Sequence, residues 1–169
     1  SAITVDFATS DGTAAAPGDY TALANTTLTF AAGETSKQVT VTIIDDTIDE
    51  ADETLFLDLS NATNAAFGDA QGLGTITDAD ATPTISIGSP SASEDSGLLT
   101  FTLTLSNASS STITVLVDTA NGTATAPGDY TALVGQLVTF TPGDLTQTVT
   151  VTLAADGVDE YDETVTAGL

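Results

Sequence analysis

Apolar and polar residues alternate along most of this 169-residue chain, and threonine fills many of the polar positions. This period of two is clearest at residues 3–7, 39–43, 101–105 and 149–153. Alternation of this kind, rich in Thr, Val and Phe, is typical of strands with one buried face. The pattern predicts an all-β protein with strands at these places. The acidic stretch 45–54 lacks the apolar stripe of a helix, and no helix is expected elsewhere.

One sequence repeat occurs twice, at an offset of 110 residues. Residues 14–23 read AAAPGDYTAL, and residues 124–133 read ATAPGDYTAL. At this offset residues 3–59 align with residues 113–169 without a gap, and 29 of the 57 aligned positions are identical. A fixed period of this length indicates tandem copies of one folding unit.

Turn-forming pairs such as Asp11-Gly12 and Asn121-Gly122 separate the alternating segments. About seven short strands per complete repeat favour tandem immunoglobulin-like β-sandwiches. We expect residues 1–80 to form a repeat without its N-terminal strands and residues 84–169 to form one without its C-terminal strands. Residues 81–83 would then be a short linker, since Pro83 favours extended backbone before it.

The charge balance excludes several partners. The chain has 24 acidic residues against one basic residue, Lys37, and its net charge is −23. It has almost nothing with which to neutralise phosphates, so nucleic acids and anionic membrane surfaces would be repelled. No apolar run approaches the length of a membrane span, and direct membrane insertion is not expected. Cations are the partners that such a charge favours.

The missing residue types argue against catalysis. The chain has no Cys, His or Arg, which removes disulfides, thiolate or imidazole nucleophile pairs and the usual zinc ligands. A carboxylate pair such as Asp49 and Glu53 is compatible with a glycosidase. That pair recurs in both copies, however, and no Trp or His is present to form a sugar platform. We therefore expect no enzyme activity.

Both copies carry a dense acidic cluster directly after an alternating segment. The first cluster comprises Asp45, Asp46, Asp49, Glu50, Asp52 and Glu53, and the second comprises Asp156, Asp159, Glu160, Asp162 and Glu163. Carboxylates this close repel one another, and Ca²⁺ relieves that repulsion because it takes six to eight oxygen ligands in flexible geometry. The alternative is a solvated acidic loop. Recurrence at the repeat offset favours metal binding.

Several motifs together resemble the Calx-beta domain. They include Val5-Asp6-Phe7, Gly18-Asp19-Tyr20, Ile43-Ile44-Asp45-Asp46, Asp49-Glu50-Ala51-Asp52-Glu53 and Gly74-Thr75-Ile76-Thr77-Asp78-Ala79-Asp80. Their order and spacing cover nearly the whole chain. The Calx-beta family occurs in sodium–calcium exchangers, an integrin subunit and many large secreted surface proteins. The resemblance implies an immunoglobulin-like sandwich that binds Ca²⁺ through loops at one end.

By position, the resemblance implies metal ligands in both copies. In the first copy they are Asp19, Asp45, Asp46, Glu50, Glu53, Asp78 and Asp80, and in the second they are Glu94, Asp129, Asp156, Glu160 and Glu163. Two departures weaken the sites. Ala155 stands where the first copy has Asp45, and Ala79 interrupts the acidic run at the end of the first copy.

These observations predict a Ca²⁺-binding structural repeat of an extracellular surface or adhesion protein, in which the ion rigidifies the sandwich ends and the junctions between repeats. Its partners would be calcium ions and neighbouring repeats or copies of the same protein. The alternative is a subunit of an extracellular filament or surface layer assembled by strand exchange, with or without Ca²⁺, because a repeat without two strands leaves sheet edges open. A ligand-binding module is a third possibility that no sequence feature marks.

Overall fold

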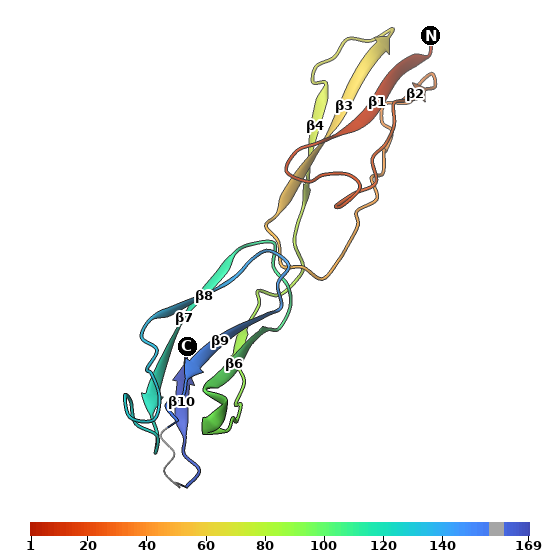
Figure 1. Ribbon diagram of the computed structural model, residues 1–169. Helices are drawn as coiled ribbons and strands as arrows, with labels where there is room; N and C mark the ends of the chain where they lie inside the picture. Colours follow the sequence, from red (N-terminus) through yellow and green to blue (C-terminus); the bar gives the residue numbers. More distant parts are fainter. Residues whose placement is uncertain (156–160) are drawn as a thin grey trace. The chain divides into compact units, whose positions relative to one another are not determined.

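The computed structural model describes residues 1–155 and 161–169 of the chain and confirms that it is all-β (Figure 1). Within that range the only helical element is a single 3₁₀ turn, η1, at Glu94–Ser96, and no helix there could cross a membrane. The strands are β1 (Ile3–Asp11), β2 (Thr26–Phe30), β3 (Glu53–Thr63), β4 (Gln71–Ile76), β5 (Ile85–Ile87), β6 (Leu98–Leu105), β7 (Ile113–Asn121), β8 (Gln136–Phe140), β9 (Thr146–Thr152) and β10 (Val165–Gly168).

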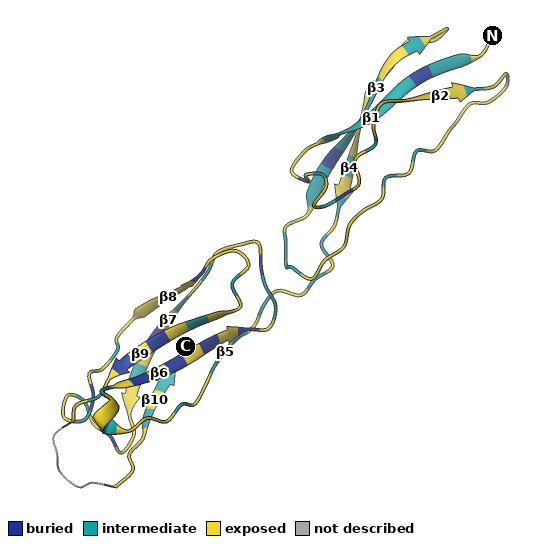
Figure 2. Cartoon of the chain, turned by 45° about the vertical axis from the view of Figure 1, so that its right-hand side comes forward, coloured by how far each residue is buried: buried dark blue, intermediate teal, exposed yellow. Residues whose placement is uncertain are grey.

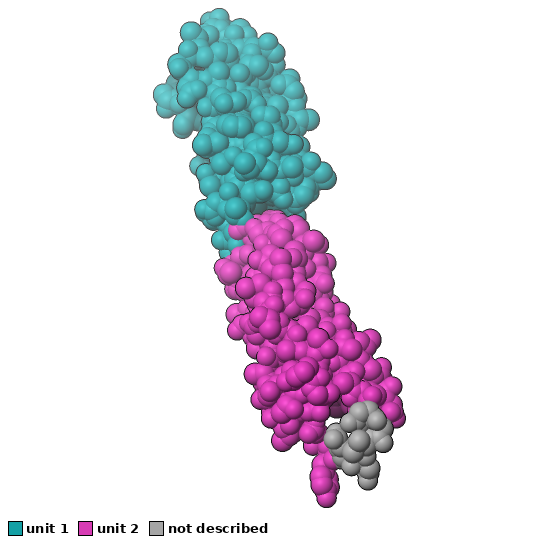
Figure 3. All heavy atoms as spheres, turned by 60° about the vertical axis from the view of Figure 1, so that its left-hand side comes forward, with its two compact units in different colours: residues 1–46, 51–79 teal, residues 47–50, 80–169 magenta. Residues whose placement is uncertain are grey.

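The chain folds into two compact units, which Figure 3 shows in different colours. Unit 1 consists of residues 1–46 and 51–79, and unit 2 of residues 47–50 and 80–169. The linker predicted at residues 81–83 stays a prediction.

Unit 2 is a sandwich of two three-stranded antiparallel sheets, ordered β5-β6-β9 and β10-β7-β8. Alternation on β6 buries every second side chain and exposes the threonines between them (Figure 2). The facing strands contribute to one core, whose members are Leu99, Phe101, Leu103, Leu105, Val117, Ala124, Tyr130, Val138, Phe140, Val149 and Val151. The period of two in the sequence therefore corresponds to the alternation of buried and exposed side chains along these strands.

Unit 1 contains one four-stranded antiparallel sheet, ordered β2-β1-β3-β4. Its buried cluster is smaller than that of unit 2: Ala14, Tyr20 and Leu55 form its centre, and Ala16, Val41 and Ile76 pack against them.

The prediction of a strand at residues 39–43 of unit 1 was wrong. Only Ile43 forms a β-bridge there, with Tyr20, whereas the equivalent segment of unit 2 forms β9. β9 is paired along its length with β6. No strand among the described residues of unit 1 pairs with this segment as β6 pairs with β9. An alternating sequence becomes a strand only when another strand supplies its hydrogen bonds.

Candidate metal centre

Asp19 stands at the end of a tight turn that both units share. One of its carboxylate oxygens, Oδ2, accepts a hydrogen bond of 2.6 Å from the backbone N–H of Ala15. Asp129 accepts the same bond, also 2.6 Å, from Thr125. A carboxylate that closes a turn onto a backbone N–H is held in a fixed direction. Both side chains are half-buried.

A buried tyrosine follows each of these aspartates and anchors the turn. The Tyr20 hydroxyl donates to Oδ1 of Asp11 at 2.6 Å, and the Tyr130 hydroxyl donates to Oδ1 of Asn121 at 2.7 Å. The Tyr20 hydroxyl and the backbone N–H of Ala16 lower the pKa of Asp11, and the hydrogen bond to Asp11 raises the pKa of Tyr20. The sequence motifs did not predict these polar contacts of the tyrosines. A tyrosine and a polar residue recur at equivalent positions of the two copies, Tyr20 with Asp11 and Tyr130 with Asn121, and this recurrence was the sequence signal that could have predicted the contacts.

The acidic segment begins beside the same turn. The backbone N–H of Thr21 donates to the carbonyl of Thr42 at 2.9 Å, and that of Ile44 donates to the carbonyl of Asp19 at 2.9 Å. These bonds hold the chain just before Asp45 against the Asp19 turn. Unit 2 repeats both contacts.

Glu53, at the start of β3, is positioned by its neighbour Thr54. The backbone N–H of Thr54 donates to the Thr13 hydroxyl at 2.8 Å. Gly12 comes so close that a Cβ atom built there would lie 2.4 Å from the carbonyl oxygen of Thr54. Only glycine permits this approach of two backbones. The conformation after Asp11 thus fixes where β3, and with it Glu53, begins.

Three predicted ligands come together in this region. Asp19, Glu50 and Glu53 each offer a carboxylate oxygen, and these oxygens all lie within 4.8 Å of one another. All three side chains are half-buried. We call these residues the acidic triad. Such a set of oxygen donors has the chemistry that Ca²⁺ prefers.

The remaining acids of the first copy do not join the acidic triad. Asp45 and Asp46 are exposed, and Asp78 and Asp80 are half-buried. Two further acids accept structural hydrogen bonds. The Asp52 carboxylate accepts from the backbone N–H of Asp78 at 3.1 Å, and the Asp49 carboxylate accepts from the buried Ser109 hydroxyl at 2.8 Å.

In the second copy, the described residues contain no group of three ligand side chains like the triad. Glu94 and Asp129 are half-buried, and Glu163 is exposed. Asp156 and Glu160 lie outside the described residues. The metal ligands predicted for this copy therefore stay predictions.

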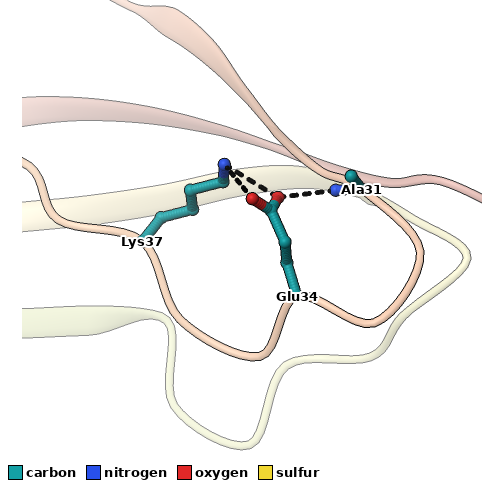
Figure 4. A network of polar contacts seen from close by, with 3 residues as sticks. All are labelled: Ala31, Glu34 and Lys37. Atoms are coloured by element: carbon teal, nitrogen blue, oxygen red, sulfur yellow. Dashed lines mark hydrogen bonds and ion pairs between the residues drawn. The ribbon is translucent and has the colours of Figure 1, made fainter.

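The single basic side chain is engaged elsewhere in unit 1. Lys37 Nζ lies 2.9 Å from Oε1 and 2.8 Å from Oε2 of Glu34, and Glu34 also accepts from the backbone N–H of Ala31 at 2.7 Å (Figure 4). These contacts, with that to Lys37 the largest, lower the pKa of Glu34.

Comparison with known proteins identifies the repeat. The Calx-beta domain family matches twice, at residues 1–85 and at residues 78–169. Sodium/calcium exchanger 2 of Rattus norvegicus and of Homo sapiens are 46% identical over 69 residues, which is 41% of this chain and 7% of each exchanger. Sodium/calcium exchanger 1 of Bos taurus is 51% identical over 57 residues, which is 34% of this chain and 6% of that protein. The chain thus corresponds to a small part of these relatives.

Two crystal structures show low similarity to this chain. CBD12 from CALX1.2 is 21% identical with a TM-score of 0.47, and the match covers 99% of this chain and 68% of that one. The calcium binding domain CBD12 of CALX1.1 is 21% identical with a TM-score of 0.46, and the match covers 89% of this chain and 62% of that one.

Proposed function

Because this chain belongs to the Calx-beta family, as a tandem pair of its domains, we propose that it is a Ca²⁺-binding structural repeat of an extracellular surface or adhesion protein. The acidic triad of Asp19, Glu50 and Glu53 carries the proposal. Bound Ca²⁺ would link the Asp19 turn to the start of β3 and so rigidify that end of the sandwich, and with it the junction to the next repeat. The protein acts without catalysis.

The chemistry of the triad favours a weak site that is filled outside cells. Extracellular Ca²⁺ modules bind the ion at about 10⁻⁴–10⁻³ M, whereas tighter sites have more charged ligands in a rigid frame. A site with three carboxylate ligands, in which water supplies the remaining oxygen ligands, is expected to have a dissociation constant in this weaker range. A strongly acidic surface also attracts the ion to the site.

Isothermal titration calorimetry with CaCl₂ tests the metal site. The wild-type chain is expected to bind Ca²⁺, and Glu53→Gln is expected to weaken binding about tenfold or more, because a charged oxygen ligand becomes neutral. Glu34→Gln is the matched control, since it removes the same charge from a residue that pairs with Lys37. It is expected to leave binding unchanged. Equal losses in the two variants, or no binding by the wild type, would refute the site.

A second candidate function is a filament or surface-layer subunit assembled by strand exchange, with or without Ca²⁺. Residues 39–43 favour it, because they alternate like β9 but have no strand beside them in the described part of unit 1. In unit 2 the partner of this segment is β6. A β6-like strand from another copy would complete the sheet by strand addition.

A labelled peptide with the sequence of residues 98–107 tests this exchange by fluorescence anisotropy. We expect saturable binding to the chain, and we expect a peptide with Phe101→Asp to lose it, because Phe101 is buried where β6 meets β9. Equal binding of both peptides, or of neither, would count against strand exchange.

A further inference from the structure

An asparagine–glycine pair, Asn121-Gly122, stands at the end of β7 in unit 2. Glycine is required at the second position, because a Cβ atom built on Gly122 would lie 2.3 Å from the carbonyl oxygen of Thr164. A glycine has no side chain to shield its backbone nitrogen from the asparagine before it. Asn121 is also exposed to solvent. The fold thus retains the dipeptide in which an asparagine side chain loses ammonia most readily.

The side-chain oxygen of Asn121 accepts two hydrogen bonds. The Tyr130 hydroxyl donates to Oδ1 at 2.7 Å, and the backbone N–H of Ala126 donates to it at 3.0 Å. A backbone N–H can only donate, so the atom that faces it is the amide oxygen and not the amide nitrogen. Two donors on one carbonyl oxygen have the arrangement of an oxyanion hole, which stabilises the negative charge that develops on this oxygen when the carbonyl carbon is attacked.

Unit 1 shows that the same two donors favour negative charge at this oxygen. The offset of 110 residues makes Asp11 the counterpart of Asn121. Its Oδ1 accepts from the Tyr20 hydroxyl at 2.6 Å and from the backbone N–H of Ala16 at 3.1 Å. The Tyr20 hydroxyl, followed by the N–H of Ala16, lowers the pKa of Asp11. The equivalent donors of unit 2 therefore stabilise an oxyanion on Asn121, and this turn accommodates a carboxylate in place of the amide.

We propose that Asn121 is a site of spontaneous deamidation in the folded chain, through which unit 2 acquires an aspartate at the position where unit 1 has Asp11. In the first step the backbone nitrogen of Gly122 forms a bond to Cγ of Asn121 and gives up its proton. The C–N bond of the side-chain amide breaks, its nitrogen leaves with that proton as ammonia, and a cyclic succinimide remains. Water then opens the ring, and the chain gains a negative charge.

The fold also determines which product the ring opening gives. Water that attacks Cγ leaves an aspartate, whereas water that attacks the backbone carbonyl carbon leaves an isoaspartate, whose main chain is longer by a methylene group. The two donors to Oδ1 polarise Cγ and so favour aspartate, which keeps both hydrogen bonds as Asp11 does. The longer main chain of isoaspartate would disturb the close approach of Gly122 to Thr164. Aspartate is therefore the main product, although unstructured peptides give mainly isoaspartate.

Peptide mapping by tandem mass spectrometry, after incubation of the full chain at mildly alkaline pH, tests the proposal. Asn121 is expected to convert mainly to aspartate, while Asn107, which precedes an alanine, stays an amide over the same period. Tyr130→Phe removes one of the two donors and is expected to slow the conversion about tenfold or more. Tyr20→Phe is the matched control, because it removes the equivalent hydroxyl from unit 1, and it is expected to leave the rate at Asn121 unchanged.

The same chain unfolded in urea provides the reference for the product, and it is expected to give mainly isoaspartate at residue 121. Faster conversion in Tyr130→Phe than in the wild type would overturn the proposal, because it would show that the hydrogen bonds protect the amide. So would mainly isoaspartate in the folded chain, or an Asn121 that stays intact while folded and converts only in urea. Asn121→Asp is expected to melt like the wild type, and a clearly lower melting temperature would contradict the accommodation of a carboxylate. None of these results depends on Ca²⁺ binding.

Discussion

Addition of about 10 mM Ca²⁺ is expected to raise the melting temperature of the chain by about 6 °C or more. This concentration is at least about ten times a dissociation constant in the weak range, and a ligand at ten times its dissociation constant stabilises the folded state by about 1.4 kcal/mol. For domains of 60–100 residues, each kcal/mol shifts the melting temperature by about 4–8 °C. The stabilisation arises because Asp19, Glu50 and Glu53 come within 4.8 Å of one another only in the folded chain. Thermal unfolding followed by circular dichroism, with CaCl₂ and then with excess chelator, measures the shift.

Mg²⁺ and two variants provide the controls for this measurement. Mg²⁺ at the same concentration is expected to produce a much smaller shift, because it demands near-ideal octahedral geometry and gives up its water reluctantly. Glu53→Gln is expected to remove most of the Ca²⁺ effect, and Glu34→Gln to retain it. Identical melting curves with Ca²⁺ and with chelator would mean that the acidic triad is a solvated cluster and the repeat a spacer.

Tyr130→Ala is expected to destabilise unit 2 by about 3–5 kcal/mol, the range for removing a large buried aromatic side chain. The Tyr130 side chain is 1% exposed and lies in the core of unit 2, and its hydroxyl holds Asn121 at 2.7 Å. The substitution leaves a cavity and an amide oxygen with one partner fewer. Urea unfolding followed by far-ultraviolet circular dichroism measures the loss in the free energy of unfolding.

Two further variants separate the causes. Tyr130→Phe keeps the ring and removes only the hydroxyl, so its cost is expected to be about 1 kcal/mol. Tyr161→Ala is the matched control, because Tyr161 is 96% exposed, and it is expected to change the free energy of unfolding by less than about 0.5 kcal/mol. A Tyr130→Phe variant as unstable as Tyr130→Ala would show that the hydrogen bond, and not the packing of the ring, dominates.

Sequence patterns predicted most of unit 2 because its strands find partners within the chain. The alternation at residues 101–105 and 149–153 corresponds to β6 and β9, which pair with each other. The same alternation at residues 39–43 predicted a strand that is not formed, although four of these five residues are identical to their counterparts in β9 and the fifth, Ile43, resembles Leu153, which follows β9. A period of two records which face is apolar, whereas strand formation also requires a neighbouring backbone.

The acidic cluster was likewise predicted from the sequence only in part. Composition and repetition identified a region rich in carboxylates, but they did not distinguish Glu50 and Glu53 of the acidic triad from Asp49, whose carboxylate accepts a hydrogen bond from Ser109. Neighbouring acids in a loop point in different directions, and their side-chain directions depend on contacts with residues distant in sequence. Ser109 is 60 positions away from Asp49, and no local pattern links the two.

The sequence by itself determined the fold class and the repeat and predicted a cation as the preferred ligand, because these follow from periodicity, self-similarity and net charge. Only the tertiary structure decided which carboxylates meet, since Asp19 and Glu53 are brought together by a turn and a strand start that are 34 residues apart. It alone also decided which apolar residues remain outside a core. Leu116 and Val117 are neighbours in the apolar run Val115-Leu116-Val117, yet Val117 is fully buried and Leu116 is 54% exposed. The difference arises because burial depends on which face of each sheet is covered.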